Sequence, residues 1–219
     1  MGSVTSGSPI KLSGQIESSN QPNVPPVDLA DLLARSASMH RHLCPRQVLG
    51  VRMGIYAGML LDIRVPQNEK RLITIVEIDG CAADGVSVAT NCWVGRRTLF
   101  LKDFGKLAAT FVDTQSNCAI RISPVFDARE LADACVSSER GNWRRQLEAY
   151  RRMPMSQLFR VENVALYEPI TRLVSHAGRK ALCDRCGEEI RNEREVHRNH
   201  AVLCRACAGE SYYKSLAAC

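Results

Sequence analysis

The apolar positions near the start of the chain repeat at helical intervals. Leu29, Leu32 and Leu33 lie three and four positions apart within residues 27–40. This spacing predicts an amphipathic helix with one apolar face turned towards a core.

A second helix is predicted directly after the first, and its pattern is strongly apolar. Pro45 suits the first helical position, because the N–H that a proline lacks would have no partner there. Gly50, Gly54 and Gly58 then recur at every fourth residue. They form a flat strip along one face of the helix, so another backbone can approach it closely.

From residue 71 onward, extended and helical segments alternate. The β-branched run RLITIVEIDG predicts a buried strand, and a helix is expected directly after it. Two or three antiparallel strands should follow, with turns at Gly105 and Asn117, then a helical region broken at Gly141 and one further strand. The ranges expected for these segments are 71–80, 81–92, 98–124, 127–153 and 156–169.

This mixture of segments predicts an α+β fold, in which helices pack on a mixed or antiparallel sheet. Residues 27–170 would form this core domain, and residues 171–219 would form a small C-terminal finger of the treble-clef or zinc-ribbon type. Residues 1–26 are rich in Ser, Gly, Asn and Pro, which predicts a disordered leader.

Composition and charge narrow the functional classes. No apolar run approaches the roughly 20 residues that span a bilayer, and the N-terminus lacks the apolar core of a signal peptide, so a cytoplasmic protein without membrane contact is expected. The formal net charge of +6 is spread evenly, with 13 basic and 10 acidic residues in 1–125 and 16 and 13 in 126–219. Nucleic acid is therefore not an expected partner, since a nucleic-acid footprint is a concentrated basic patch.

Four of the ten cysteines have the spacing of a zinc site. Cys183 and Cys186 form one CxxC pair, and Cys204 and Cys207 form a second pair after 17 intervening residues. Each pair can turn two thiolates towards one ion, so together they complete a tetrahedral Zn(Cys)4 shell. Because protein thiolates fill all four positions, this zinc would be structural, and its binding would supply folding energy to a segment with almost no apolar core.

The other residues of the finger favour a contact role over nucleic-acid binding. His197 and His200 are expected to be solvated, because the second CxxC makes them unnecessary as ligands. Residues 212–216, YYKSL, are expected to begin a helix, and the motif CxxCGEEI with its gap of 17 is similar to the zinc finger of DksA/TraR-type regulators. Residues 183–210 hold five Arg and six acidic residues, so with four thiolates and one Zn²⁺ the module carries about −3 and would bind phosphate poorly.

A second group of ligand-type residues precedes the glycine-containing helix. His40, His42 and Cys44 occupy alternate positions, so in an extended segment they project to the same side. Cys44 also stands at the helix N-cap, where the helix dipole favours a thiolate. These residues could supply most of a metal shell, or a nucleophile with a neighbouring base. Equally, they could be polar N-cap residues beside a buried cysteine.

Further motifs in the predicted core extend this group into a longer pattern. Glu77, Asp79 and Cys81 alternate at the end of the predicted strand, and Cys92 precedes a glycine–basic turn and the sequence KDFGK. Together with HRHLCP, these motifs resemble the FmdE family of formylmethanofuran dehydrogenase proteins over about residues 27–210. In that family the same motifs occur in this order, and a four-cysteine finger often follows them.

The resemblance implies an α+β core with a metal or ligand site in a cleft, a homodimer, and an appended finger. It also implies that Asp79, Arg96 and Lys102 either support the residues that hold the metal or bind an anion. The site residues that it implies are His40, His42, Cys44, Cys81, Asp84 and Cys92.

Two arginines distinguish this chain from the family pattern. Arg41 stands where the family has a glycine between the histidines, and Arg46 where it has a glycine after the Cys-Pro pair. Ser87 and Arg96 replace a frequent Gln and a Lys. Arginines at the mouth of a cleft could select an anionic ligand or accompany a loss of the ancestral chemistry. The family motifs by themselves do not imply catalysis.

Two functional hypotheses follow from these motifs. The first is a metal-binding protein of this family, in which the core holds a second transition metal or a ligand beside the structural zinc, with an accessory role in a redox or one-carbon enzyme complex. The second is a regulatory or interaction protein without catalytic activity, whose finger contacts a larger complex. Outside these motifs, Cys118 and Cys135 are expected in the core.

Overall fold

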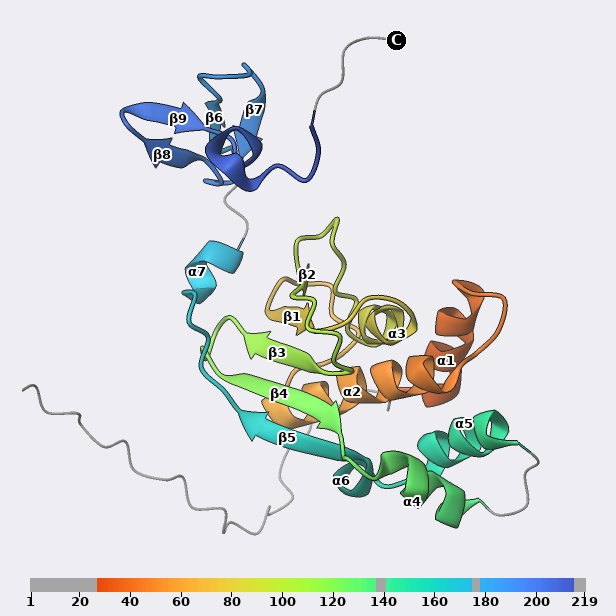
Figure 1. The fold of residues 1–219 in the computed structure, drawn as a ribbon. Coiled ribbons are helices and arrows are strands. Elements are labelled where there is room, and N and C mark those ends of the chain that lie inside the picture. Colours follow the sequence, from red (N-terminus) through yellow and green to blue (C-terminus); the bar gives the residue numbers. More distant parts are fainter. Residues whose placement is uncertain (1–26, 137–140, 175–177, 215–219) are drawn as a thin grey trace, which may run out of the picture.

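The computed structural model describes residues 27–136, 141–174 and 178–214, which fold as an α+β core followed by a small finger (Figure 1). The predicted leader, residues 1–26, lies outside the described residues. In the described part of the chain, no helix is both long and apolar enough to cross a membrane.

Six helices belong to the core, and the first two confirm the predicted pattern. Pro45 is the first residue of the second helix, and Cys44 is its N-cap. The strand expected from residue 156 is wrong for residues 156–158, because Met155–Leu158 is helical and the strand begins at Phe159. The helices are α1 (Leu29–Ser38), α2 (Pro45–Leu61), α3 (Cys81–Thr90), α4 (Ala128–Cys135), α5 (Asn142–Arg152) and α6 (Met155–Leu158).

Five strands form one mixed sheet. In sheet order they are β2 (Leu99–Leu101), β1 (Leu72–Val76), β3 (Ala109–Asp113), β4 (Ala119–Pro124) and β5 (Phe159–Asn163). The pairs β1–β3, β3–β4 and β4–β5 are antiparallel, whereas β2 runs parallel to β1. The strands of residues 98–124 alternate in direction as expected, but β2 pairs with β1 and not with β3. The pair β1–β2 is parallel because α3 lies between the two strands and acts as the crossover that a parallel pair needs.

The glycines of α2 allow it to contact α3 backbone to backbone. A Cβ added to Gly50 would lie 2.1 Å from the carbonyl oxygen of Ala82, and one added to Gly54 would lie 2.7 Å from the Cβ of Ala89. This confirms the predicted close approach. Both contacts advance in the same direction along the two helices, so the N-terminal ends of α2 and α3 lie on the same side of the molecule.

An arginine is buried in the core between α2 and the end of α5. The side chain of Arg52 is on α2 and is only 5% exposed. Its guanidinium donates hydrogen bonds to the carbonyl oxygens of Tyr150 and Met153, the latter at 2.6 Å. These carbonyls belong to the last turn of α5, where no helical N–H is left to bond them. Arg52 therefore holds the end of α5 against the centre of α2.

The finger consists of two hairpins and a single helical turn, joined to the core through α7 (Ile170–Leu173) (Figure 1). Residues 212–214 of the helix expected at YYKSL are non-helical, and residues 215–216 lie outside the described residues. The helical turn of the finger, η1, comes earlier, at Ala206–Glu210. The finger strands are β6 (Lys180–Leu182), β7 (Glu189–Arg191), β8 (Val196–Arg198) and β9 (Ala201–Leu203), paired as β6–β7 and β8–β9.

Two cysteines lie outside the core, contrary to expectation. Cys118 is exposed in the turn that precedes β4, and Cys135 is exposed as the last residue of α4. Both positions are at the end of an element, where the apolar pattern no longer faces the core.

Candidate functional site

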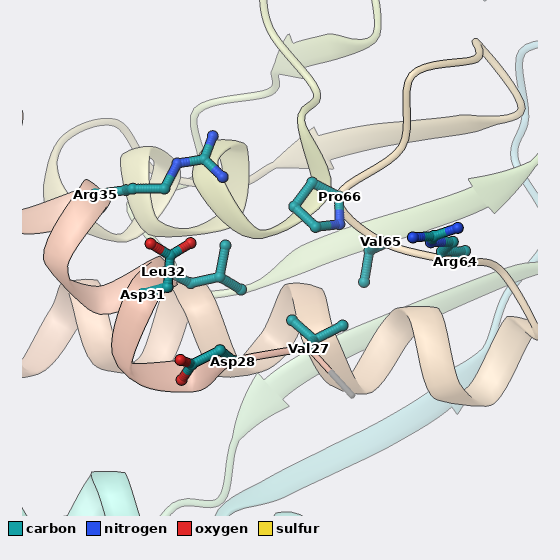
Figure 2. A pocket seen from close by; sticks show the side chains of 8 residues that line it. All are labelled: Val27, Asp28, Asp31, Leu32, Arg35, Arg64, Val65 and Pro66. Atoms are coloured by element: carbon teal, nitrogen blue, oxygen red, sulfur yellow. The ribbon is translucent and has the colours of Figure 1, made fainter. Parts of the chain in front are cut away.

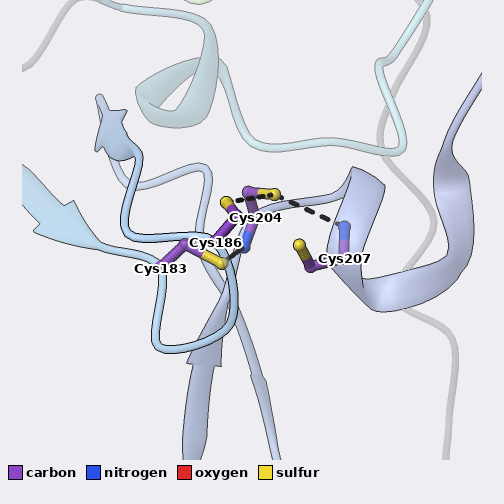
Figure 3. A group of neighbouring side chains, drawn as sticks. All are labelled: Cys183, Cys186, Cys204 and Cys207. Atoms are coloured by element: carbon purple, nitrogen blue, oxygen red, sulfur yellow. Dashed lines mark hydrogen bonds between the residues drawn. The ribbon is translucent and has the colours of Figure 1, made fainter. Parts of the chain in front are cut away.

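The four finger cysteines converge on one point (Figure 3). Cys183 and Cys186 come from the β6–β7 turn, and Cys204 and Cys207 from the end of β9 and the following helical turn. Their sulfur atoms all lie within 4.8 Å of one another, and the Sγ atoms of Cys186 and Cys204 are 3.9 Å apart. Zn–S bonds of about 2.3 Å in a tetrahedron require sulfur–sulfur separations of about 3.8 Å. The donor set therefore fits a zinc ion.

The backbone around these cysteines favours a thiolate at Cys183. The N–H of Cys204 donates to the Sγ of Cys183 at 3.2 Å, and this bond, followed by one from the N–H of Cys186, lowers the pKa of the Cys183 thiol to about 6. The pKa of Cys207 is raised to about 12, first by its hydrogen bond with Cys204. Gly187, directly after the first CxxC pair, has a φ of +76°, which suits the tight turn that presents Cys183 and Cys186. Four thiolates cannot share this space without a cation, so zinc fits the electrostatics as well as the geometry.

The core group is built where the loop after α1 meets the start of α3. The Nε2 atom of His40 lies 2.8 Å from the Oδ2 atom of Asp84, in the first turn of α3. Both side chains are about one-third exposed, at 30% and 33%. A carboxylate in this position fixes the orientation and tautomer of the imidazole. The structure thus brings together His40 and Asp84, two of the residues that the resemblance implied.

Two thiols lie beside this pair at the ends of the two packed helices. Cys44 caps α2 and is buried, while Cys81 is the first residue of α3. The pKa of Cys81 is raised first by burial and then by its hydrogen bond with Cys44, and the charge of Arg46 opposes this rise. The thiols of Cys44 and Cys81 are therefore neighbours, with a cationic side chain close to them.

Sequence comparison identifies both parts of the chain. Residues 39–160, more than half of the chain, match the family described as FmdE, molybdenum formylmethanofuran dehydrogenase operon. The chain belongs to the FmdE family. Residues 177–213 match the prokaryotic DksA/TraR C4-type zinc finger, so the metal-binding finger is appended to an FmdE domain, as its motifs predicted.

Two relatives extend this assignment. A protein of Archaeoglobus fulgidus named "Probable S-adenosyl-L-methionine-binding protein" is 31% identical over 212 residues, covering 86% of this chain and 55% of the relative. The chain thus spans about half the length of that relative. A crystal structure of a tungsten formylmethanofuran dehydrogenase FmdE-like protein from Syntrophus aciditrophicus has a TM-score of 0.54 and 20% identity, covering 90% of this chain and 100% of the other. This likeness shows that the fold is shared.

Not all the predicted site residues of the FmdE domain lie together. Cys92 is fully buried, and its thiol bonds the amide of Gln67 and the carbonyl oxygen of Leu72, each at 3.4 Å. It follows the C-terminal end of α3, whose ten residues span about 15 Å from Cys81. The structure therefore separates Cys92 from the core group. His42 is exposed, and its ring faces Trp143 of α5 with the ring centroids 6.3 Å apart.

The three residues expected to support the site or bind an anion have other contacts than the core group. Asp79 is exposed just before α3. Arg96 donates to the backbone oxygen of Asn68 at 2.6 Å and so supports a loop. Lys102 follows β2 and lines a different cavity. In the described part of the chain, only the finger cysteines place three or more ligand-type atoms within 4.8 Å of one another.

A cavity beside α1 is unrelated to these groups. It has a volume of about 170 Å³ and is lined by residues of α1 and of the loop at 64–66 (Figure 2). Its charged side chains are balanced, with Asp28 and Asp31 beside Arg35 and Arg64. Asp28 already accepts a hydrogen bond from the N–H of Ala30 as the N-cap of α1. The cavity contains no histidine or cysteine among its described lining residues.

Sequence reasoning missed a residue that positions the core group. The side-chain oxygen of Gln47 accepts from the N–H of Cys44 at 2.7 Å, and its amide nitrogen donates to the carbonyl oxygen of Ser36 at 2.8 Å. The N–H of Gln47 in turn donates to the Sγ of Cys44 at 3.4 Å. This is a capping box in which cysteine replaces the usual Ser or Thr, and the spacing Cys-x-x-Gln was its sequence signal.

Proposed function

We propose that the FmdE domain binds a transition metal ion, or a ligand that such an ion holds, through His40, Cys44 and Cys81. The observation that carries this proposal is the hydrogen bond between His40 and Asp84 beside two neighbouring thiols. With Nε2 of His40 bonded to the carboxylate, Nδ1 is left to coordinate, and a carboxylate behind a ligating imidazole is the usual arrangement at metal sites. Imidazole and thiolate donors together suit zinc or a similar ion.

The surroundings of the site support binding more than they support a specific reaction. The capping box fixes Cys44, and the contact of α2 with α3 fixes Cys81 relative to it. His42, two residues before Cys44, is exposed and lies beside the ring of Trp143. A bound divalent ion would supply a Lewis acid there. The residues of the chain provide the donors, their orientation and a partly covered surface.

Metal analysis of the purified full-length chain tests this proposal. We expect two metal ions per chain in the wild type and one in the double variant Cys44→Ser/Cys81→Ser. The double variant Cys183→Ser/Cys186→Ser should also retain one ion, in the core. The substitution Cys135→Ser, at an exposed cysteine, is the control and should leave two. One ion per wild-type chain that disappears with the finger cysteines would refute the core site.

The proposal extends to an accessory role, as a homodimer, in a redox or one-carbon enzyme complex. The family description, which names a formylmethanofuran dehydrogenase operon, supports this role. Light scattering of the purified chain tests the dimer. The name of the Archaeoglobus relative adds S-adenosyl-L-methionine as a ligand to test by calorimetry. If wild type and Cys44→Ser/Cys81→Ser bind it equally, that ligand does not use the core site.

A second candidate function is a regulatory protein whose finger contacts a larger complex. The match to the DksA/TraR finger favours this candidate. Affinity capture with the full chain and with a chain lacking residues 175–219 would test it. Capture of the same partners by both chains would argue against a contact role for the finger.

A further inference from the structure

A cavity of about 540 Å³ lies where the finger meets the core, and no cysteine is among its described lining residues. Phe100 and Lys102 of the core line one side of it, and Arg172 and Leu173 of α7 line another. The finger contributes its loop at residues 192–195 and Arg205. The volume is in the range of small-molecule sites, and three separate parts of the chain form the walls.

A hydrogen bond ties the core and finger walls of this cavity together. Nη1 of Arg97, in the turn before β2, donates to the Oδ1 of Asn192 in the finger loop. Arg97 adopts a φ of +58°, so the turn that carries it has a defined left-handed geometry. The finger is therefore anchored to the core at the cavity itself.

Three of the four cations that line the cavity are not neutralised by carboxylates of the described residues, and the fourth, Arg205, lies 3.9 Å from Glu210. Lys102, Arg172 and Arg194 come from three different elements, and none has an ion-pair partner within the part of the chain that the structure describes. The pKa of Arg97 is lowered by burial and further by the positive charge of Arg194. These two guanidinium groups therefore repel one another, and an anion between the cations would relieve that repulsion.

Three carboxylates also line the cavity, and one of them is neutralised by an arginine. Glu193 pairs with Arg179, whereas Glu195 has the imidazole of His197 at 3.9 Å, which carries a charge only when it is protonated. Glu168 is the remaining acidic side chain of the lining. Among the described residues, three cations without ion-pair partners against two carboxylates that no arginine or lysine neutralises leave the cavity with a net positive charge.

We propose that this cavity binds a phosphate ester of a small planar molecule. Lys102, Arg172 and Arg194 would hold the phosphate, because each guanidinium group can bond two phosphate oxygens and the Lys102 ammonium adds a compact positive charge. Phe100 and Leu173 form the apolar wall against which the planar group would lie. Glu168 is placed to accept a hydrogen bond from an amino or hydroxyl group of the same ligand. A ligand bound here touches core and finger together, so it would stabilise their arrangement.

Calorimetry on the zinc-loaded full chain tests the proposal, with AMP as the probe. We expect AMP to bind at least tenfold more tightly than inorganic phosphate, because only AMP reaches the apolar wall. Each of Lys102→Ala, Arg172→Ala and Arg194→Ala should weaken AMP binding about tenfold, the effect of one hydrogen bond to a charged group. Lys106→Ala is the matched control, since Lys106 is exposed in the same loop as Lys102 but does not line the cavity.

Three results would overturn the proposal. They are no binding of AMP by the wild type, equal AMP binding by the wild type and the triple alanine variant, and inorganic phosphate binding as tightly as AMP. None of these substitutions changes His40, Cys44 or Cys81. The metal content measured for the core site is therefore an independent result, and failure of either proposal leaves the other standing.

Discussion

Replacement of Arg52 by methionine tests how the core holds α5. The guanidinium is only 5% exposed, and burial lowers its pKa, yet an arginine remains charged at neutral pH. Its two donated hydrogen bonds reach the carbonyl oxygens of Tyr150 and Met153 at the C-terminal end of α5. A cation is favoured at that end by the helix dipole.

The expected loss can be estimated from these contacts. Each hydrogen bond from a charged donor contributes about 1.5–3 kcal/mol, and a buried carbonyl left without a donor costs about 1–3 kcal/mol. Methionine is apolar and of similar length, so Arg52→Met removes the donors without opening a large cavity. Part of this lost stability is offset, because the variant no longer has to bury a positive charge. We expect a net destabilisation of about 3 kcal/mol. Arg52→Lys should lose about half as much, since an ammonium is a single-point donor.

Urea denaturation of the zinc-saturated chain, followed by far-ultraviolet circular dichroism, measures these differences. Arg151→Met is the matched control, because Arg151 is exposed on α5 and lies 3.7 Å from Glu148 in a surface pair. It should change the free energy of unfolding by less than about 1 kcal/mol. If Arg52→Met is as mild as this control, the buried arginine does not hold α5, and the reasoning fails.

Three further predictions concern packing, pH and zinc. Gly50→Ala should lower the free energy of unfolding by about 3 kcal/mol in urea denaturation, because its Cβ would lie 2.1 Å from a carbonyl oxygen. Gly95→Ala is the control and should be nearly neutral, because an added Cβ there would have nothing within 4 Å. Equal effects of the two substitutions would contradict the close contact of α2 and α3. The hydrogen bond from Arg71 lowers the pKa of Asp113, so its stabilisation exists above the unfolded pKa of about 3.9 and is lost as pH falls through the lower folded value. Asp113→Asn should therefore cost about 1–2 kcal/mol at pH 7, and the two urea curves should converge in acid; a constant difference would refute this. Cys207→Ser should release the finger zinc and expose residues 178–214 to protease without changing core stability, and an intact, protected finger would count against structural zinc.

The sequence predicted most elements because their local signals agreed with the fold. Pro45 at the start of a helix and the glycines at every fourth position both appear as expected. The pairing of β2 with β1 could not be predicted, because a strand of three residues is too short to indicate its neighbour in the sheet. The exposure of Cys118 could not be predicted either, because it depends on where the turn before β4 ends and not on the residue type.

The finger cysteines were more predictable than the core group for a physical reason. A CxxC pair contains its own turn, so two pairs define a site without knowledge of the remaining fold. The core group depends on tertiary contacts that bring α3 to α2. Cys81 and Asp84 do reach the loop that contains His40, but Cys92 stands at the opposite end of α3. The order of the motifs along the chain did not show that Cys81 and Cys92 lie at opposite ends of the same helix.

The close contact of α2 and α3 links the fold to the proposed core site. An added Cβ at Gly50, 2.1 Å from a carbonyl oxygen, would have to retreat to about 3.4 Å to reach ordinary van der Waals contact, which moves the helices apart by more than 1 Å. Metal–ligand distances tolerate only about 0.2 Å. Cys44 and Cys81 each stand at the start of one of these helices, so the separation that a methyl group imposes would pull their thiols out of range of a common ion. The glycines of α2 therefore determine the spacing of the two thiols as well as the packing of the core.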